Sequence, residues 1–135
     1  MIGSVVSKYT ILEKLGEGGM GEVYLAEDTD LNRKVALKFL PEQFASDADS
    51  LARFKREAQT AAGLNHPNII TVYEVGEHKG RPYIAMAYVE GESLADIIAR
   101  KDMTVEKALD LAAQILAGLA KARRRGRLLR RCGWR

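Results

Sequence analysis

The chain has 135 residues and a formal net charge of +3, with 47% hydrophobic and 29% charged residues. This length and composition are typical of a globular domain, and they exclude a disordered chain, a collagen-like repeat and a coiled coil. The single cysteine, Cys132, cannot form an internal disulfide, and no Cys/His cluster has metal-ligand spacing, so disulfide-stapled scaffolds and zinc modules are excluded. No apolar run is long enough to span a bilayer, and residues 1–8 lack the character of a secretory signal, so we expect a cytoplasmic protein.

The charge is unevenly distributed along the chain. Residues 1–120 hold 13 basic and all 18 acidic side chains, a formal charge of −5, whereas residues 121–135 hold eight basic side chains and no acid. An acidic body therefore carries a short basic tail, and the break near residue 121 is the clearest boundary in the sequence.

Hydrophobic residues alternate with polar ones in several short segments, which predicts strands. The first two strands are expected at 9–15 and 22–27, joined by a glycine-rich turn, and the third at 34–40, ended by Pro41. Two more strands are expected at 69–76 and 81–89, joined by a short turn.

Apolar side chains recur at helical spacing in three other segments. Residues 50–64 are expected to form a helix that Asp49 or Ser50 caps. Ser93 is expected to begin a short helix at 94–100, and Thr104 to cap a longer one at 105–122.

The first turn contains Gly-x-Gly-x-x-Gly, a pattern that several kinds of phosphate site use. A Rossmann site needs a helix after the last glycine, whereas EVYLAE alternates like a strand. A Walker A loop needs Lys and then Ser or Thr after Gly21, where this chain has Glu22 and Val23. A strand–loop–strand hairpin that folds its N–H groups over phosphates, with Val23 against a base, fits the pattern. From the loop alone, a glycine-rich turn without a ligand stays open.

Two further features favour a nucleotide site. Alternation along the third strand places Ala36 and Lys38 on the same face, where the small residue leaves room for a flat ligand and the lysine can meet its phosphates. Glu57 is the only acid between residues 50 and 73, lies beside the apolar stripe of its helix, and is a candidate partner for Lys38. The plain alternative is that Lys38 faces solvent, as most lysines do.

Together these motifs resemble the N-terminal lobe of a protein kinase, closest to the bacterial Ser/Thr kinases of eukaryotic type. The matching stretches are LGEGGMGEVYLAED, VALKFL, FKREAQTAAGLNHPNII and IAMAYVEGESL, and the resemblance covers about residues 8–122. It implies an α+β fold with an N-terminal extension at 1–8 and an ATP-binding N-lobe at 9–90, a five-stranded antiparallel sheet with one regulatory helix. Residues 91–122 would be the first two helices of an incomplete C-lobe, and 123–135 an Arg-rich tail outside the fold.

The resemblance also assigns roles to residues. Lys38 would contact the ATP phosphates and form an active-state ion pair with Glu57. Met86 would be the gatekeeper behind the base, or ordinary core packing. Ala87, which replaces an acid common in the family, would begin a hinge that binds the adenine edge through backbone groups. The remaining nucleotide contacts would come from Leu15, Gly16, Glu17, Gly18, Gly19, Met20, Gly21, Glu22, Val23, Ala36, Tyr88, Val89 and Ser93.

The resemblance implies transfer of the ATP γ-phosphate to Ser or Thr of protein substrates, with magnesium entering as Mg-ATP. In this family a catalytic-loop His-Arg-Asp supplies the proton acceptor and an Asp-Phe-Gly holds Mg²⁺. Both are absent from the 135 residues, so neither a proton acceptor nor a metal ligand is expected. We therefore expect the chain alone to be inactive. The alternatives are a non-catalytic module that binds nucleotide or docks on another kinase through its N-lobe, and an unstable product of a truncated or frameshifted gene.

The tail has two interpretations. Residues 123–135 hold seven arginines and no lysine. Such an arm could bind nucleic acid or an anionic membrane. It lacks interleaved aromatic residues and begins where a kinase element should continue, so an out-of-frame or truncated origin is favoured and no specific nucleic-acid partner is expected. The apolar face around Leu109, Leu116 and Leu119 would then be uncovered, which predicts poor solubility or oligomerisation.

Overall fold

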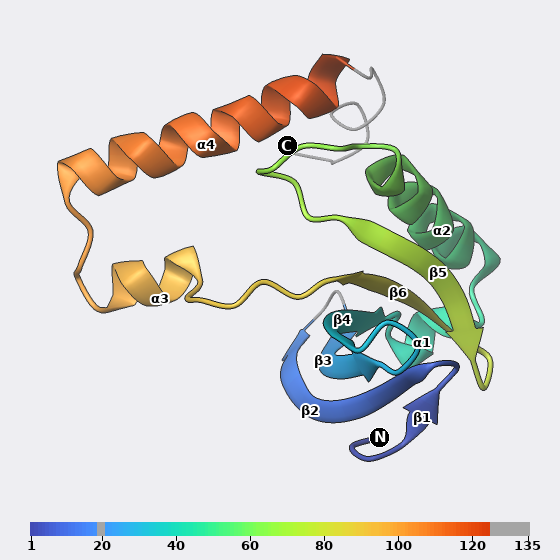
Figure 1. Ribbon diagram of the computed structural model, residues 1–135. Helices are drawn as coiled ribbons and strands as arrows, with labels where there is room; N and C mark the ends of the chain where they lie inside the picture. The colour runs from blue at the N-terminus through green and yellow to red at the C-terminus, as the bar shows by residue number, and fades with distance from the viewer. Residues whose placement is uncertain (19–20, 125–135) are drawn as a thin grey trace. The chain divides into compact units, whose positions relative to one another are not determined.

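The computed structural model describes residues 1–18 and 21–124. They form two compact units (Figure 1). The first, here called the sheet unit, comprises Met1–Gly63 and Ile70–Tyr88. The second, called the helical unit, comprises Leu64–Ile69 and the described part of Val89–Arg135. Among the described residues no helix is both long enough and apolar enough to cross a bilayer.

The sheet unit is built on one antiparallel sheet of six strands in the order β1-β2-β3-β4-β6-β5. All five predicted strands are confirmed, and the sixth is a short strand that the sequence did not indicate. Several predicted ends are wrong: the first predicted strand continues to Gly18 rather than ending at 15, and the last stops at Ala87 rather than at 89. The strand expected at 69–76 runs from Val72 to His78, because a turn in which Ile69 N–H donates to His66 O precedes it. The strands are β1 Val5–Val6, β2 Tyr9–Gly18, β3 Gly21–Asp28, β4 Arg33–Phe39, β5 Val72–His78 and β6 Arg81–Ala87.

One face of the sheet carries the main core, and the sheet curls around it. The rings of Tyr9 and Tyr83 meet edge to face at 6.3 Å although their strands, β2 and β6, are not neighbours. Phe39 lies between further rings, 5.8 Å from Tyr24 and 5.7 Å from Tyr83. These contacts hold the curl closed. The cluster consists of Val6, Tyr9, Ile11, Tyr24, Ala26, Val35, Leu37, Phe39, Tyr83 and Ala85.

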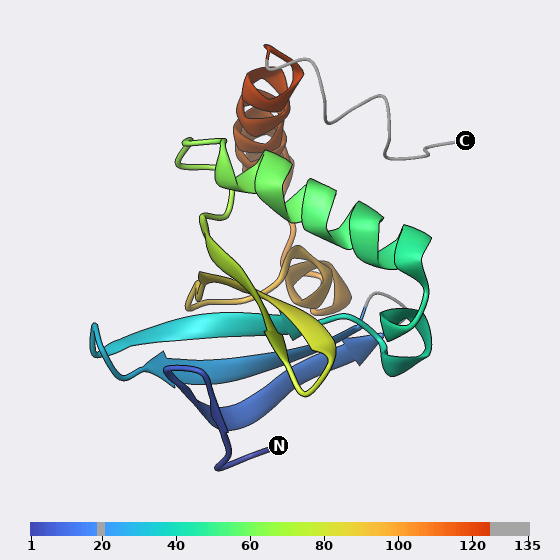
Figure 2. The ribbon, with the colours of Figure 1, turned by 90° about the vertical axis from the view of Figure 1, so that its right-hand side faces the viewer.

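The opposite face packs against α2 (Ala48–Ala62), which follows the single turn α1 (Glu42–Ala45) and lies alongside β5 (Figure 2). Phe54 and Ala58 of this helix contact Leu40 and Ile84, with Val72, Val75 and Met86 packed around them. The predicted cap was wrong. Asp47, not Asp49 or Ser50, is the N-cap, and its carboxylate accepts from Ser50 N–H at 3.0 Å, so the helix begins earlier.

The helical unit contains α3 (Leu94–Ala99) and α4 (Val105–Arg124). Both predicted caps are confirmed: Ser93 forms a capping box with Asp96, and Thr104 Oγ1 accepts from Lys107 N–H at 3.2 Å. Helix α4 continues two residues beyond its expected end, and the rest of the Arg-rich tail lies outside the described residues.

The segment Leu64–Ile69 packs on α4 within the helical unit. The side-chain amide of Asn68 donates to Gln114 O at 2.9 Å. Gly118 is buried against this segment, so closely that a Cβ there would lie 3.2 Å from Asn68 O. Another face of α4 is exposed, with Leu109 at 67% and Leu116 at 64%, so the apolar face expected from the sequence is present in the described residues.

Candidate nucleotide site

Register across three strands brings four predicted site residues to one face of the sheet. Val23 of β3 lies opposite Lys38 of β4, and Ala36 of β4 lies opposite Met86 of β6. Directly opposite residues in an antiparallel sheet project to the same side. Lys38 also lies opposite Ile84, which packs against α2, so this is the face that α2 covers in part.

The four residues form a small apolar surface with an amine beside it. Ala36 is 6% exposed, and Val23, Lys38 and Met86 are each half-buried. A methyl group beside larger apolar side chains suits contact with a flat ring, and a lysine two residues further along β4 suits an anionic group attached to that ring. This arrangement can bind a planar ligand that carries phosphates.

The glycine-rich segment is the end of the β2–β3 hairpin. Gly18 pairs with Gly21, while Gly19 and Met20 lie outside the described residues. Gly21 has φ +110°, and a Cβ there would lie 2.0 Å from Phe39 O, so only glycine fits. At Gly16 a Cβ would meet nothing within 4 Å, and at Gly18 it would also meet open space. Leu15 is 42% exposed, so this edge of the hairpin is open.

Two other predicted residues, Glu17 and Glu22, carry ion pairs next to the turn of the hairpin. Lys14 Nζ donates to Glu17 Oε2 at 2.5 Å and to Glu22 Oε1 at 3.0 Å. Arg81 Nη2 donates to Glu22 Oε2 at 2.8 Å. The hydrogen bonds from Arg81 and then Lys14 lower the pKa of Glu22 to about 2. A depressed carboxyl pKa contributes stability above the ordinary carboxyl range, and this contribution is lost as the pH falls towards 2.

The predicted active-state pair and hinge are only partly described. Glu57 lies in α2, but its side chain is outside the described side chains, so its pairing with Lys38 stays a prediction. Ala87 N–H donates to Thr71 O at 2.8 Å, which commits this donor to the sheet unit. In the helical unit, Val89 is 73% exposed, and Ser93 Oγ donates to Asp96 Oδ2 at 2.5 Å.

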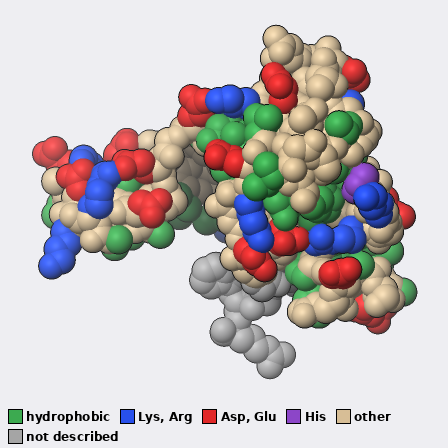
Figure 3. All heavy atoms as spheres, turned by 90° about the horizontal axis from the view of Figure 1, so that it is seen from below, with side chains coloured by type: hydrophobic (Ala, Val, Ile, Leu, Met, Phe, Trp, Pro, Cys, Tyr) green, Lys and Arg blue, Asp and Glu red, His purple; other side chains and the backbone are tan. Residues whose placement is uncertain are grey.

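Acidic and basic side chains lie beside one another on the surface seen in Figure 3. Within residues 1–18 and 21–124, no group of three or more His, Cys, Asp or Glu side chains could hold a metal ion.

The family model for the protein kinase domain matches residues 9–126. The chain belongs to the protein kinase family. The family resemblance and the α+β kinase-like fold expected from the sequence are therefore confirmed.

Bacterial serine/threonine-protein kinases are among the relatives of this kinase chain. It is 44% identical over 124 residues to the serine/threonine-protein kinase PrkC of Bacillus subtilis, a match that covers 90% of this chain and 19% of PrkC. It is also 44% identical over 117 residues to the serine/threonine-protein kinase PknB of Mycobacterium tuberculosis, with 83% of this chain and 19% of PknB covered.

A solved kinase domain has the same fold. The crystal structure of the Mycobacterium tuberculosis PknI kinase domain superposes with a TM-score of 0.80 at 34% identity, over 93% of this chain and 52% of that one. The chain thus spans about a fifth of the length of the curated relatives and about half of the solved kinase domain.

Proposed function

We propose that this chain is the ATP-binding portion of a protein Ser/Thr kinase, and that its sheet unit binds the nucleotide. The observation that carries the proposal is the register that puts Val23, Ala36, Lys38 and Met86 on one half-buried face beside the glycine hairpin. In the complete kinase domain the nucleotide so held would donate its γ-phosphate to Ser or Thr of a protein substrate.

Each residue of the sheet unit then has a physical task. Ala36 leaves room for the adenine ring, and Leu15 and Val23 would pack against the same ring. Lys38 would neutralise the α- and β-phosphates and be oriented by Glu57. The backbone N–H groups of the hairpin would point at the phosphates, where side chains would block their approach.

The adenine edge would be bound by backbone groups of the hinge. Because Ala87 N–H is committed to Thr71 O, we assign the Ala87 carbonyl to the base. Ser93, as the N-cap of α3, already uses its hydroxyl proton, so towards a ribose it would accept a hydrogen bond rather than donate one.

Magnesium would enter with the nucleotide, where it bridges phosphate oxygens and neutralises charge that develops during transfer. The 135 residues contain neither His-Arg-Asp nor Asp-Phe-Gly. We therefore propose that this polypeptide on its own binds Mg-ATP without transferring its phosphate. Protein substrates and a cytoplasmic location stay predictions.

Replacement of Lys38 by methionine should weaken ATP binding about tenfold or more, because a charge-assisted contact with phosphate is lost while the length of the side chain is kept. Calorimetric titration with Mg-ATP and with adenosine measures this effect. Adenosine should bind equally to both proteins. Lys55→Met, at an exposed position of α2, is the matched control and should leave both affinities unchanged. Equal ATP affinities for Lys38→Met and the unmodified chain would contradict the proposal.

The purified chain incubated with labelled ATP, Mg²⁺ and a generic basic protein substrate should incorporate no label, because it has no residue for the proton-acceptor role. PknB assayed in parallel serves as the positive control. Incorporation that disappears in the Lys38→Met variant would show that the chain is itself an active kinase.

A further inference from the structure

Four charged side chains join the end of the glycine hairpin to a strand that it does not pair with. They are Lys14 and Glu17 of β2, Glu22 of β3 and Arg81 of β6. Glu22 is central, because its carboxylate accepts from both Lys14 and Arg81, and from Tyr24 OH at 3.3 Å.

The link between Glu22 and Arg81 passes over a third strand. In the sheet, β4 lies between β3 and β6. The Arg81 guanidinium lies 5.4 Å from the centre of the Phe39 ring and also donates to Leu40 O at 3.3 Å. Arg81 therefore crosses the end of β4 and fixes the first residue after Gly21 to both β4 and β6.

Burial makes this pair different from most surface ion pairs. The side chains of Glu22 and Arg81 are 23% and 21% exposed, so solvent screens them only in part. On its β2 side the hairpin has little other support, since residues 12–18 are all exposed, whereas its β3 side pairs with β4. The pair thus supplies a defined anchor at the point where the hairpin is otherwise open.

The anchor lies on the opposite face from the candidate nucleotide site. Glu22 pairs with Phe39 in the register and bonds to Tyr24, and both rings belong to the core face, whereas Val23 and Lys38 project to the other side. Glu22 and Arg81 therefore hold the hairpin from behind.

We propose that Arg81 is a positioning residue for the nucleotide's phosphates, acting through Glu22 to hold the glycine hairpin at a fixed height over them. The inference rests on the proposed ATP-binding function. It predicts a selective effect. Loss of the Glu22–Arg81 pair should weaken the contacts between the hairpin and the phosphates. The contacts of the sheet and hinge with the base should stay unchanged.

Arg81→Met and Glu22→Gln test the inference by titration with Mg-ATP and with adenosine. Each variant should bind ATP about fivefold more weakly and adenosine unchanged. The double variant should lose less ATP affinity than the sum of the two single losses, because both single variants remove the Glu22–Arg81 interaction, whereas the Lys14 and Leu40 contacts are each affected by only one of them. Arg81→Lys, which keeps the charge, should recover most of the ATP affinity.

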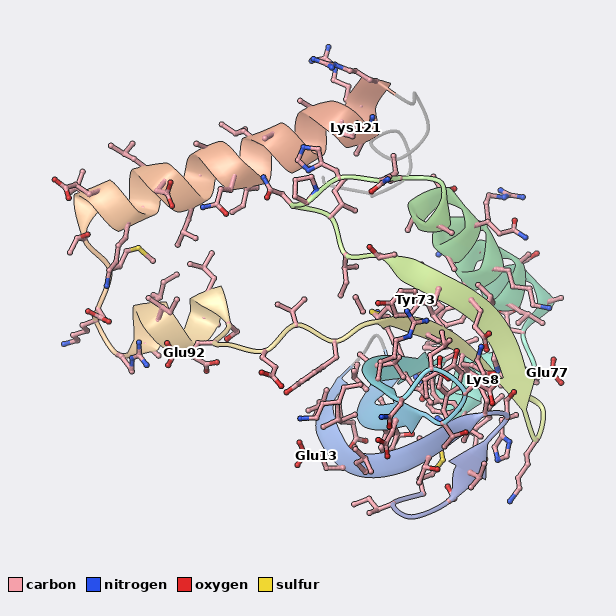
Figure 4. All side chains as sticks on the ribbon, viewed as in Figure 1. Lys8, Glu13, Tyr73, Glu77, Glu92 and Lys121 are labelled. Carbon is pink, nitrogen blue, oxygen red and sulfur yellow. The ribbon has the colours of Figure 1, made fainter. Side chains whose placement is uncertain are left out.

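The matched control is Lys8→Met at the other end of β2. Lys8, labelled in Figure 4, forms an ion pair with Glu74, with 3.4 Å between Lys8 Nζ and Glu74 Oε2. The two side chains are 32% and 33% exposed, and Lys8 Nζ lies 5.4 Å from the centre of the Tyr9 ring. Like Arg81, Lys8 therefore has a half-buried carboxylate and an aromatic ring as neighbours, but it lies far from the glycine turn in the sequence. Lys8→Met should leave the ATP affinity unchanged. Equal ATP affinities for Arg81→Met and the unmodified chain, or equal losses for ATP and adenosine, would overturn the inference.

Hydrogen exchange separates this inference from the proposed function. Without nucleotide, Arg81→Met should speed amide exchange at Gly18 and at residues 21–23 and leave β5 unchanged. If the unmodified chain binds neither Mg-ATP nor adenosine, the proposed function fails, and the phosphate-positioning role fails with it. Unchanged exchange at Gly18 and at residues 21–23 of a chain that does bind ATP would overturn the anchor alone.

Discussion

Replacing Phe39 with alanine is expected to lower the free energy of unfolding of the sheet unit by about 3 to 5 kcal/mol, the range for a large aromatic residue removed from a packed core. Phe39 is 0% exposed and contacts the rings of Tyr24 and Tyr83. The vacated volume lies between β-strands that pair along their length, so the surrounding backbone can collapse into it only in part. Urea denaturation followed by tyrosine fluorescence measures the change, because Tyr9, Tyr24 and Tyr83 all lie in this core.

Phe44 provides the matched control. It is the same residue type in α1 but 38% exposed, so Phe44→Ala should change the free energy of unfolding by less than about 1 kcal/mol. A Phe39→Ala variant as stable as Phe44→Ala would mean that the aromatic cluster does not stabilise the sheet.

Gly21→Ala is expected to destabilise the sheet unit by about 2 to 4 kcal/mol and to weaken ATP binding at the same time. The residue has φ +110°, a region that residues with a Cβ avoid, and the added Cβ would lie 2.0 Å from Phe39 O. The obstacle is a backbone carbonyl of β4, so the hairpin must move rather than a side chain. Thermal denaturation and Mg-ATP titration of the same variant measure both effects.

Gly18→Ala, on the other side of the same turn, separates backbone geometry from the mere loss of a glycine. A Cβ at Gly18 meets nothing within 4 Å, so this variant should stay within about 1 kcal/mol of the unmodified chain. Equal stability of the two variants would contradict the geometry described for Gly21.

The main elements could be predicted because their signals are local. Alternation and the Gly and Pro punctuation indicated five strands, and helical spacing indicated α2, α3 and α4. The two-residue strand β1 and the single turn α1 are too short to carry a period. The cap of α2 was misassigned because Asp47, Asp49 and Ser50 are all capable caps, and only the path of the chain after α1 selects Asp47.

The candidate site divides in the same way. The common face of Ala36 and Lys38 follows from alternation within a single strand, and pairing extends it to Val23 and Met86. The contact between Glu22 and Arg81 joins residues 59 positions apart on strands that are not neighbours. No local pattern encodes such a pair, since it depends on how far the sheet curls.

The edge-to-face contact between Tyr9 and Tyr83 joins the start of the chain to the last strand of the sheet, so this contact can form only late in synthesis. Tyr9 is made early, and its ring partner is made only after α2 and β5. Contacts between distant parts of a chain form late and slowly. Strand β6, which enters between β4 and β5, is the last strand of the sheet to be made, so the part of the aromatic core that Tyr83 completes can close only after its synthesis.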